Sequence, residues 1–285
     1  MSARTWTIRD VLDWATQDFS ARGIESARLD AELLVARALG IDRIGLYLDL
    51  HRPLQEAERS AIRPLVARRR DREPVAYILG HRDFFGRRFE VTPDVLIPRP
   101  DTETLVEHAL AQIPKDAPSR VLDVGTGSGA IAVTLASERP AARITATDIS
   151  KAALEVAGRN AAAHGVQDRI TFEHVDLLRA SSPYDVIVSN PPYIARTEVE
   201  TLQEEVRDHE PDTALFGGED GLDVIRRLLD VARPAVEAGA HLLIEVGAAQ
   251  AAAVVDLGIE TGAWKRVAVY PDLDRVERVV HLRRT

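Results

Sequence analysis

Hydrophobic and polar positions follow two different patterns in the two parts of this chain. Between residues 7 and 70 the apolar residues recur with the spacing of amphipathic helices, which predicts helices within 7–23, 26–40, 44–50 and 54–70. Thr7 followed by Asp10 resembles a capping box at the start of the first of these helices. From residue 120 onward, short apolar runs alternate with longer amphipathic segments. This alternation predicts a parallel sheet with helices on its faces.

Seven apolar runs are the candidate strands of this sheet: 120–124, 143–147, 170–174, 185–189, 241–246, 265–270 and 277–282. The last two are joined only by residues 271–276, a connection too short for a parallel crossover. We therefore expect the final strand to run antiparallel to the others. A doubly wound, mostly parallel seven-stranded sheet with one antiparallel strand resembles the class I methyltransferase fold, which is Rossmann-like.

Residues 75–92 separate the two parts and have a third pattern. Aromatic and aliphatic residues stand among Gly80 and Gly86, which is typical of a β-hairpin. The expected organisation is a helical N-terminal domain in residues 1–74, a β-hairpin linker in 75–92 and an α/β domain in 93–285.

Composition and charge narrow the range of functions. The chain has no cysteine, which excludes disulfides, thiolate metal sites and a cysteine nucleophile. The sequence shows no signal-peptide pattern and no uninterrupted membrane span, so we expect a cytoplasmic protein. Residues 1–90 hold 16 Lys and Arg against 14 Asp and Glu, whereas residues 91–285 hold 20 against 31. An acidic α/β domain disfavours stable nucleic-acid binding and suits a basic protein partner, although acidic residues that only keep the surface soluble would give the same count.

A glycine-rich turn follows the first candidate strand directly. It consists of Gly125, Thr126, Gly127, Ser128 and Gly129. Such a turn lets the backbone approach a ligand closely, and the helix that begins at Ala130 offers free N–H groups. Asp148 ends the next strand, 25 residues after Asp123, where an acid typically accepts ribose hydroxyls. The pattern fits a dehydrogenase, which would hold a pyrophosphate here, and a methyltransferase, in which Asp123 would orient the methionine end of the cofactor.

Two further strand ends carry candidate site residues. Asp176 and Leu177 follow the third strand, where Asp176 is placed to bond an adenine amino group and Leu177 to pack on the ring. Asn190, Pro191, Pro192 and Tyr193 follow the fourth strand, beside the glycine turn. Open α/β sheets bind ligands at this edge, so we expect all these residues to face one cleft.

The residues from Asn190 to Tyr193 suit the methylation of a planar nitrogen. Neither proline has an N–H, so the Asn190 side-chain oxygen and the Pro191 carbonyl can both accept hydrogen bonds from an incoming N–H₂ group. Tyr193 supplies a flat face. An amide nitrogen is a poor nucleophile because its lone pair is delocalised into the carbonyl group. The barrier of about 18–20 kcal/mol to rotation about the amide bond shows how large this resonance is. Two acceptors can aim that nitrogen and favour its transition-state geometry without a metal, and we expect no metal site.

Several sequence blocks resemble the HemK/PrmC-type protein-(glutamine-N5) methyltransferases. They are residues 73–80, the segment Val95-Leu96-Ile97-Pro98-Arg99-Pro100-Asp101-Thr102-Glu103, the glycine turn, Asp148, residues 190–193, and Glu210-Pro211 with Gly217-Gly218-Glu219-Asp220-Gly221-Leu222. The resemblance covers nearly the whole chain. Two positions depart from the family: Leu177 stands where some members have an aromatic residue, and Arg275 stands where a glycine is expected, which puts the final turn in doubt.

The resemblance implies a cofactor, a substrate and further site residues. The methyl donor would be S-adenosyl-L-methionine, leaving S-adenosyl-L-homocysteine, and the target would be the glutamine of the Gly-Gly-Gln loop of peptide chain release factors. Asn190 and Pro191 would bind the glutamine amide, and the N-terminal helices would help dock the release factor. Arg99, Pro100 and Thr102 are weaker substrate-binding candidates, because the two prolines of this segment suit a bracing role and Thr102 suits a cap for the helix expected at 103–113.

Three rival functions share parts of these patterns. A nucleic-acid adenine-N6 methyltransferase would use the same glycine turn and the same Asn-Pro-Pro-Tyr sequence, but it calls for a basic groove and a target-recognition region. A nicotinamide-dependent oxidoreductase is supported only by the glycine spacing. A non-catalytic adaptor with a degenerate methyltransferase fold is disfavoured by the intact residues 190–193.

Overall fold

The computed structural model describes residues 5–179 and 183–285. The chain forms two compact units. One comprises the chain up to Gly80 together with Glu204–His209, and the other comprises His81–Gln203 and Glu210–Thr285. A short segment from the second half of the sequence therefore belongs to the N-terminal unit.

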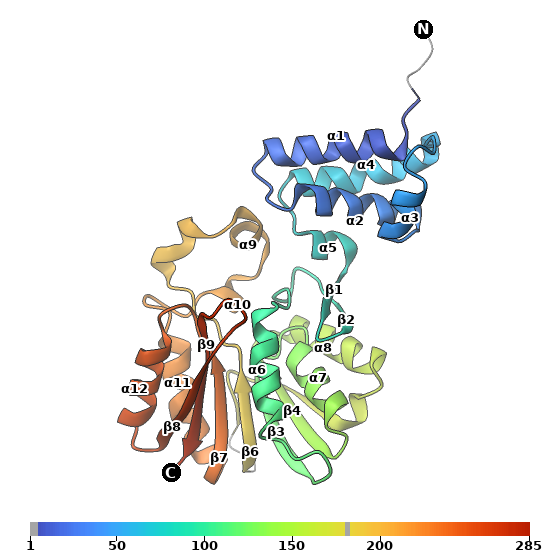
Figure 1. The fold of residues 1–285 in the computed structure, drawn as a ribbon. Coiled ribbons are helices and arrows are strands. Elements are labelled where there is room, and N and C mark those ends of the chain that lie inside the picture. The colour runs from blue at the N-terminus through green and yellow to red at the C-terminus, as the bar shows by residue number, and fades with distance from the viewer. Residues whose placement is uncertain (1–4, 180–182) are drawn as a thin grey trace. The chain divides into compact units, whose positions relative to one another are not determined.

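The N-terminal unit is helical (Figure 1). Its helices are α1 (Ile8–Ala21), α2 (Ala27–Leu39), α3 (Arg43–Leu48), α4 (Glu56–Arg70), α5 (Val75–Leu79) and α9 (Glu204–His209). The predicted capping box is present, because Thr7 accepts from the Asp10 N–H and the Asp10 carboxylate accepts from the Thr7 N–H. Ser26, the residue before α2, makes no capping hydrogen bond and donates instead to Asp30.

Helix α9 is attached to this unit by ion pairs around a buried arginine. Arg69, 4% exposed, pairs with Asp30 at 2.7 Å and with Glu205 at 2.7 Å. Arg72 adds contacts to Glu204 and Glu205. Burying a guanidinium is costly unless its donors are paired, so these acids are structural partners of Arg69.

The expected hairpin starts later than the sequence indicated. Residues Val75–Leu79 are a helix, α5, which begins after Pro74 and ends at Gly80 with φ +78°. The two strands of the hairpin are β1 (His81–Phe84) and β2 (Arg87–Glu90). Pro74 fixes a backbone angle suited to a helix start, and the left-handed Gly80 terminates the turn. The side chains of Phe84 and Phe89 are buried in the core of the second unit.

The second unit is built on the expected seven-stranded sheet. Its strands are β3 (Ser119–Val124), β4 (Ala142–Asp148), β5 (Ile170–His174), β6 (Tyr184–Ser189), β7 (Val236–Glu245), β8 (Trp264–Pro271) and β9 (Glu277–Arg284). They lie in the order β5-β4-β3-β6-β7-β9-β8. Strand β9 is antiparallel to both of its neighbours and the other pairings are parallel, which confirms the predicted reversed final strand.

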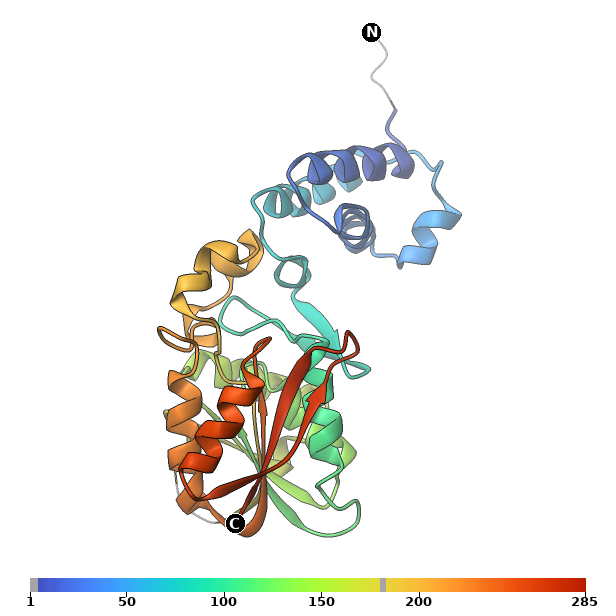
Figure 2. The ribbon, with the colours of Figure 1, turned by 60° about the vertical axis from the view of Figure 1, so that its left-hand side comes forward.

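Helices cover both faces of this sheet (Figures 1 and 2). Helices α6 (Asp101–Leu110), α7 (Ala130–Glu138) and α8 (Lys151–Ala163) pack on one face, and α11 (Asp223–Ala232) and α12 (Ala251–Glu260) on the other. Strand β3 shows why both faces are apolar: Val121 belongs to one core cluster, whereas Leu122 and Val124 belong to the other. Among the described residues, no helix has the length and hydrophobicity needed to cross a membrane.

The short elements lie in the connections. They are α10 (Asp212–Leu215) and the 3₁₀ segments Gln167–Arg169, Arg196–Thr201 and Arg233–Ala235. Arg275, which replaces the expected glycine, adopts φ +64° in the turn between β8 and β9. The turn still forms, because the Asp272 carboxylate accepts from the N–H groups of Asp274 and Val276. An arginine thus occupies a conformation that favours glycine.

Candidate active site

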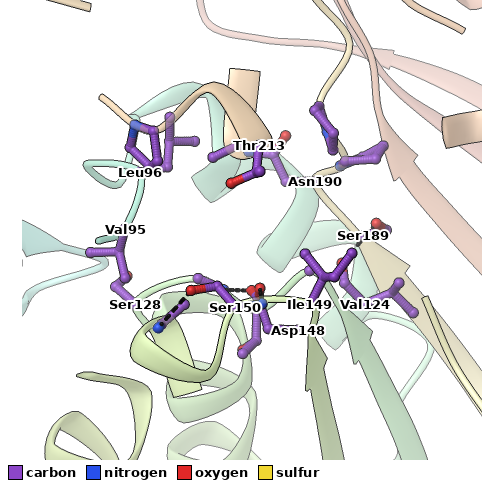
Figure 3. A pocket seen from close by; sticks show the side chains of 18 of the residues that line it. Val95, Leu96, Val124, Ser128, Asp148, Ile149, Ser150, Ser189, Asn190 and Thr213 are labelled. Carbon is purple, nitrogen blue, oxygen red and sulfur yellow. Dashed lines mark hydrogen bonds between the residues drawn. The ribbon is translucent and has the colours of Figure 1, made fainter. Parts of the chain in front are cut away.

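A cavity lies at the carboxyl ends of the central parallel strands, as expected for an open α/β sheet (Figure 3). Ser128, Asp148 and Ser150 lie on one side of it, and Leu96, Thr213 and Asn190 lie across from them. Of the residues predicted from the sequence, those that line the cavity are Arg99, Thr102, Gly125, Thr126, Gly127, Ser128, Asp148, Asp176, Leu177, Asn190, Pro191 and Pro192. Pro100, Asp123, Gly129 and Tyr193 are close in sequence to these residues but do not line it.

The glycine turn leaves its backbone open toward a ligand. Gly125 and Gly127 have φ of +74° and +53°, and a Cβ at either would meet no atom within 4 Å. The Gly127 N–H donates to Asp148 Oδ2 at 2.9 Å, and the Ser150 N–H donates to Asp148 Oδ1 at 2.8 Å. Burial raises the pKa of Asp148, while these N–H donors favour its ionised form. Asp148 is thereby held at the end of β4 with lone pairs left for hydroxyl donors.

Asp123 and Gly129 do not line the cavity but support the glycine turn from the protein interior. Asp123 is fully buried, and its Oδ2 accepts from Thr126 Oγ1 at 2.6 Å and from the Ala132 N–H at 3.2 Å. Its Oδ1 has no hydrogen-bond partner within the described part of the chain. Burial raises the pKa of Asp123 to about 7. A Cβ at Gly129 would lie 3.0 Å from the Cβ of Ala157, so this glycine lets α7 and α8 approach each other.

The residues after β5 also line the cavity. The Asp176 carboxylate pairs with the Arg227 guanidinium, and both side chains are about half exposed. Leu177 has φ +61°, and its carbonyl accepts from Thr147 Oγ1 at 2.5 Å. Arg227 stands 51 residues from Asp176 in the sequence, so this pairing could not be read from a local motif.

The loop from Asn190 to Tyr193 is held at both ends. Ser189 Oγ donates to the Val124 carbonyl at 2.8 Å, which ties the end of β6 to β3. Asn190 Nδ2 donates to Thr102 Oγ1 at 3.1 Å. The Tyr193 carbonyl accepts from Gln250 Nε2 at 2.9 Å. The loop is therefore held in place by hydrogen bonds to β3, α6 and the start of α12.

The Tyr193 side chain points to a buried carboxyl rather than into the cavity. Its hydroxyl lies 3.5 Å from Glu245 Oε1, at the end of β7, and Glu245 is 1% exposed. Burial raises the pKa of Glu245 to about 7 and also raises that of Tyr193. The sequence analysis missed Glu245, although its place at the end of a parallel strand was an available signal.

A second glycine-rich loop, residues 217–221, packs directly against the backbone of residues 190–193. A Cβ at Gly217 would lie 2.5 Å from the Pro192 carbonyl oxygen, and a Cβ at Gly221 would lie 2.2 Å from that of Tyr193. The Ile194 N–H donates to the Leu215 carbonyl, and the Gly217 N–H donates to the Ile194 carbonyl. Only residues without a side chain allow this approach, which explains the glycines of this loop.

The segment before α6 contributes to the cavity wall. Arg99 Nη2 lies 2.6 Å from Glu210 Oε1, and burial raises the pKa of Glu210. Pro100 is the residue that precedes the helix, whose first residue is Asp101. The expected cap at Thr102 was therefore wrong, because Thr102 lies in the first turn and contacts Asn190 instead.

These features define the protein as a methyltransferase with the class I fold. The strand order, the antiparallel β9 and the glycine turn that follows β3 support this class. Residues 10–80 match the family model described as PrmC N-terminal domain, and residues 101–209 match the one described as methyltransferase small domain.

Similarity to curated proteins extends over nearly the entire chain. It is 47% identical to a release factor glutamine methyltransferase of Geobacter sulfurreducens, over 90% of this chain and 90% of that protein. A protein of the same name from Cereibacter sphaeroides is 46% identical over 96% of this chain and 97% of its own length. The chain belongs to the release factor glutamine methyltransferase family.

Solved structures agree with the fold. A methyltransferase from Pyrococcus furiosus, 18% identical, matches 70% of this chain and 90% of its own with a TM-score of 0.52. A Thermus thermophilus 16S rRNA N2 G1207 methyltransferase, 19% identical, matches 72% of this chain and 50% of its own with a TM-score of 0.51. At this level of identity the likeness concerns the fold alone.

Proposed function

We propose that the protein transfers a methyl group from S-adenosyl-L-methionine to the side-chain amide nitrogen of the glutamine in the Gly-Gly-Gln motif of peptide chain release factors. The observation that carries the proposal is the placement of Asn190-Pro191 beside the glycine turn, with Asn190 held by Thr102. The names of the relatives support the same substrate.

The residues present fit the methyl donor. The open backbone at Gly125 and Gly127 leaves room that a side chain would fill. Asp148 offers lone pairs for ribose hydroxyls, and the unpaired Oδ1 of Asp123, buried beneath the turn, would reach the amino group of the cofactor through water. S-adenosyl-L-methionine would supply an electrophilic methyl group on a sulfonium.

Asn190 and Pro191 would bind the glutamine amide. With Asn190 Nδ2 donating to Thr102 Oγ1, the Asn190 Oδ1 would be the acceptor for one N–H of the substrate. The Pro191 carbonyl would accept the second N–H. Two acceptors at these positions aim the nitrogen at the methyl carbon and stabilise the geometry that the nitrogen adopts in the transition state.

The charge distribution supports a protein substrate over a nucleic acid. The acidic residues 91–285 suit a basic surface on a partner that works against RNA, and the N-terminal unit is the proposed docking domain for it. An adenine-N6 methyltransferase would call for a basic groove, and the described cavity contains Asp94, Asp148 and Asp176 beside Arg99 and Arg227. The proposal places the enzyme in the cytoplasm.

Peptide mass spectrometry of an unmethylated release factor tests the proposal. The factor is incubated with S-adenosyl-L-methionine and either the wild-type chain or the Asn190→Ala variant. The proposal predicts one added methyl on the Gly-Gly-Gln peptide with the wild type and a loss of at least about 100-fold in rate with the variant. No methylation by a preparation that binds S-adenosyl-L-homocysteine would reject the substrate assignment.

A further inference from the structure

The side chain of Gln250 joins the end of β7 to the segment that carries the proposed acceptors. Gln250 is the residue that precedes α12, and it is half-buried. The Gly247 N–H donates to Gln250 Oε1 at 2.9 Å, and Gln250 Nε2 donates to the Tyr193 carbonyl at 2.9 Å. Within the part of the chain that the structure describes, Gln250 is the only donor to that carbonyl. One side-chain amide thus bridges residues that lie 57 positions apart in the sequence.

The two partners of Gln250 fix the orientation of its amide group. A backbone N–H only donates and a carbonyl only accepts, so the amide oxygen must face Gly247 and the N–H₂ group must face Tyr193. The flipped amide would place donor against donor and acceptor against acceptor. Gln250 therefore offers its N–H₂ group in one direction, toward the end of residues 190–193.

The backbone around Gln250 is shaped for these contacts. Ala249 has φ +67°, a left-handed conformation that is unfavourable for a residue with a Cβ. A Cβ at Gly247 would lie 2.9 Å from Gln250 Oε1, and a Cβ at Gly221 would lie 2.8 Å from Gln250 Nε2. Backbone strain of this kind persists only where the surrounding structure maintains it, and here it occurs in the turn that returns the Gln250 side chain to Gly247.

The prolines of residues 190–193 transmit a constraint at Tyr193 to the Pro191 carbonyl. Their rings fix two of the backbone angles, so few torsions within this segment are free. The hydrogen bond from Ser189 to β3 holds the start of the segment, and Gln250 holds its end. With both ends held, the direction of the Pro191 carbonyl is set.

We propose that Gln250 is a positioning residue, which holds the Tyr193 carbonyl and thereby sets the direction in which the Pro191 carbonyl meets the substrate N–H₂ group. This inference rests on the proposed function, in which the Pro191 carbonyl is the second acceptor for the glutamine amide. Without the Gln250 donor, residues 190–193 can turn away from the geometry that the transition state requires. The result is a lower kcat with an unchanged cofactor pocket, since neither Gln250 nor Tyr193 lines the cavity.

Gln250→Glu tests the donor with almost no change of shape. The new carboxylate can still accept from the Gly247 N–H, but when ionised it has no proton for the Tyr193 carbonyl. We expect kcat for release-factor methylation at pH 8 to be about 10- to 100-fold below that of the wild type, the effect of leaving a carbonyl without its donor. Protonation at lower pH restores a donor, so the ratio of variant to wild-type kcat should rise at least about 5-fold between pH 8 and pH 5.5.

Two further variants separate this donor from other effects. Gln250→Met keeps the length of the side chain and removes both hydrogen bonds, so its kcat should be low without recovery at pH 5.5. Gln112→Glu is the matched control, the same change at a half-buried glutamine outside the cavity, whose Nε2 lies 3.5 Å from the His108 carbonyl. It should keep the wild-type kcat at both pH values. The Kd of S-adenosyl-L-homocysteine, measured by calorimetry, should change less than about 3-fold in every variant.

The wild-type reaction keeps two possible failures apart. No methylation by the wild-type protein would reject the proposed function. Methylation by the wild type together with an equal kcat for Gln250→Glu at pH 8, or with a ratio that does not change with pH, would overturn the role of Gln250 alone.

A measurement without substrate examines the Tyr193 carbonyl itself. With ¹³C-carbonyl tyrosine and ¹⁵N isoleucine, only the Tyr77–Ile78 and Tyr193–Ile194 peptide bonds join the two labels. The Tyr193 carbonyl resonance of Gln250→Glu should differ from that of the wild type at pH 8 and approach it at pH 5.5, whereas the Tyr77 resonance should be the same in both proteins. Identical Tyr193 resonances in the two proteins at pH 8 would reject the contact, whether or not release factors are the substrate.

Discussion

Arg99 Nη2 lies 2.6 Å from Glu210 Oε1 and thereby joins the segment before α6 to the segment before α10. Glu210 is 5% exposed, whereas a third of the Arg99 side chain is exposed. Arg99 lines the cavity, as do Pro211 and Thr213, which follow Glu210. This one ion pair therefore fixes two parts of the cavity wall.

Replacing Arg99 by alanine should weaken both the fold and ligand binding. The change leaves the Glu210 carboxyl buried without its cation, and we expect a loss of about 1–3 kcal/mol in the free energy of unfolding and weaker binding of S-adenosyl-L-homocysteine. Urea denaturation and calorimetry measure the two effects. Arg88→Ala removes an ion pair between two exposed side chains and should cost less than about 0.5 kcal/mol. Equal costs for the two variants would show that the Glu210 pair has no special role.

The glycine-rich loop 217–221, which packs on residues 190–193, should not tolerate a side chain. In Gly217→Ala the new Cβ would lie 2.4 Å from the Gly221 carbonyl oxygen and 2.5 Å from that of Pro192, so residues 190–193 must shift. We expect at least about a 100-fold loss of kcat/KM, since a displacement of 1 Å at a reacting group has an effect of this size. Gly158→Ala in α8 is the control, because its Cβ meets no atom within 4 Å and alanine favours a helix by about 0.5–1 kcal/mol. Wild-type activity in Gly217→Ala would contradict the bracing role of this loop.

Arg275→Gly should stabilise the protein. Arg275 is exposed and has φ +64°, a left-handed conformation that costs a residue with a side chain about 1–2 kcal/mol. Glycine adopts it freely but loses about 0.5–1 kcal/mol through the greater freedom of the unfolded chain. The expected net gain is about 0.5–1 kcal/mol, measured as a higher denaturation midpoint with unchanged activity. A lower midpoint would mean that Arg275 makes a stabilising contact that outweighs the strain.

A histidine cluster in the sheet should make stability depend on pH. His281, 1% exposed on β9, contacts His241 at 2.8 Å and the Tyr270 hydroxyl at 3.3 Å, and His108 stacks on Tyr270. Burial, followed by His241, His108 and Arg283, lowers the pKa of His281 to about 4. The unfolded chain therefore binds the proton first, so this contribution to stability is complete above about pH 6.5 and is lost as the pH falls toward 4.

His281→Gln isolates the contribution of His281 from that of the buried carboxyls. Their pKa values are raised by folding, so they make the folded state more stable as the pH falls. Relative to the wild type, the variant should gain about 3 kcal/mol in the free energy of unfolding between pH 7 and pH 4. Hydrogen exchange of the β9 amides measures this free energy in the second unit, which contains His281. His51→Gln, at an exposed position of the N-terminal unit, is the control. A difference from the wild type that is independent of pH would refute the prediction.

The features that lie close together in the sequence could be predicted from it. The seven strands, the reversed last strand and the residues around the glycine turn follow from apolar runs, short connections and strand-end motifs. The two hydrogen-bond acceptors proposed at Asn190 and Pro191 could also be predicted, because neither Pro191 nor Pro192 has an N–H.

The features that depend on packing between distant segments could not. Glu245 meets Tyr193 only because the ends of β7 and β6 lie side by side, and Gln250 reaches the Tyr193 carbonyl from the start of α12. Helix α9 joins the N-terminal unit through Arg69 and Arg72, although it follows residues 190–193 in the sequence. No local periodicity marks these partners, since each ion pair or hydrogen bond spans many residues.

The most direct test of the account compares two forms of one release factor, the unmethylated wild type and a form whose Gly-Gly-Gln glutamine is replaced by asparagine. Each is incubated with the protein and S-adenosyl-L-methionine, and tandem mass spectrometry locates the methyl group. We expect one methyl on the glutamine side-chain nitrogen and at least about a 100-fold slower reaction with asparagine, whose amide is one methylene short of Asn190 and Pro191. Methylation at another residue, or equal rates for the two forms, would contradict it.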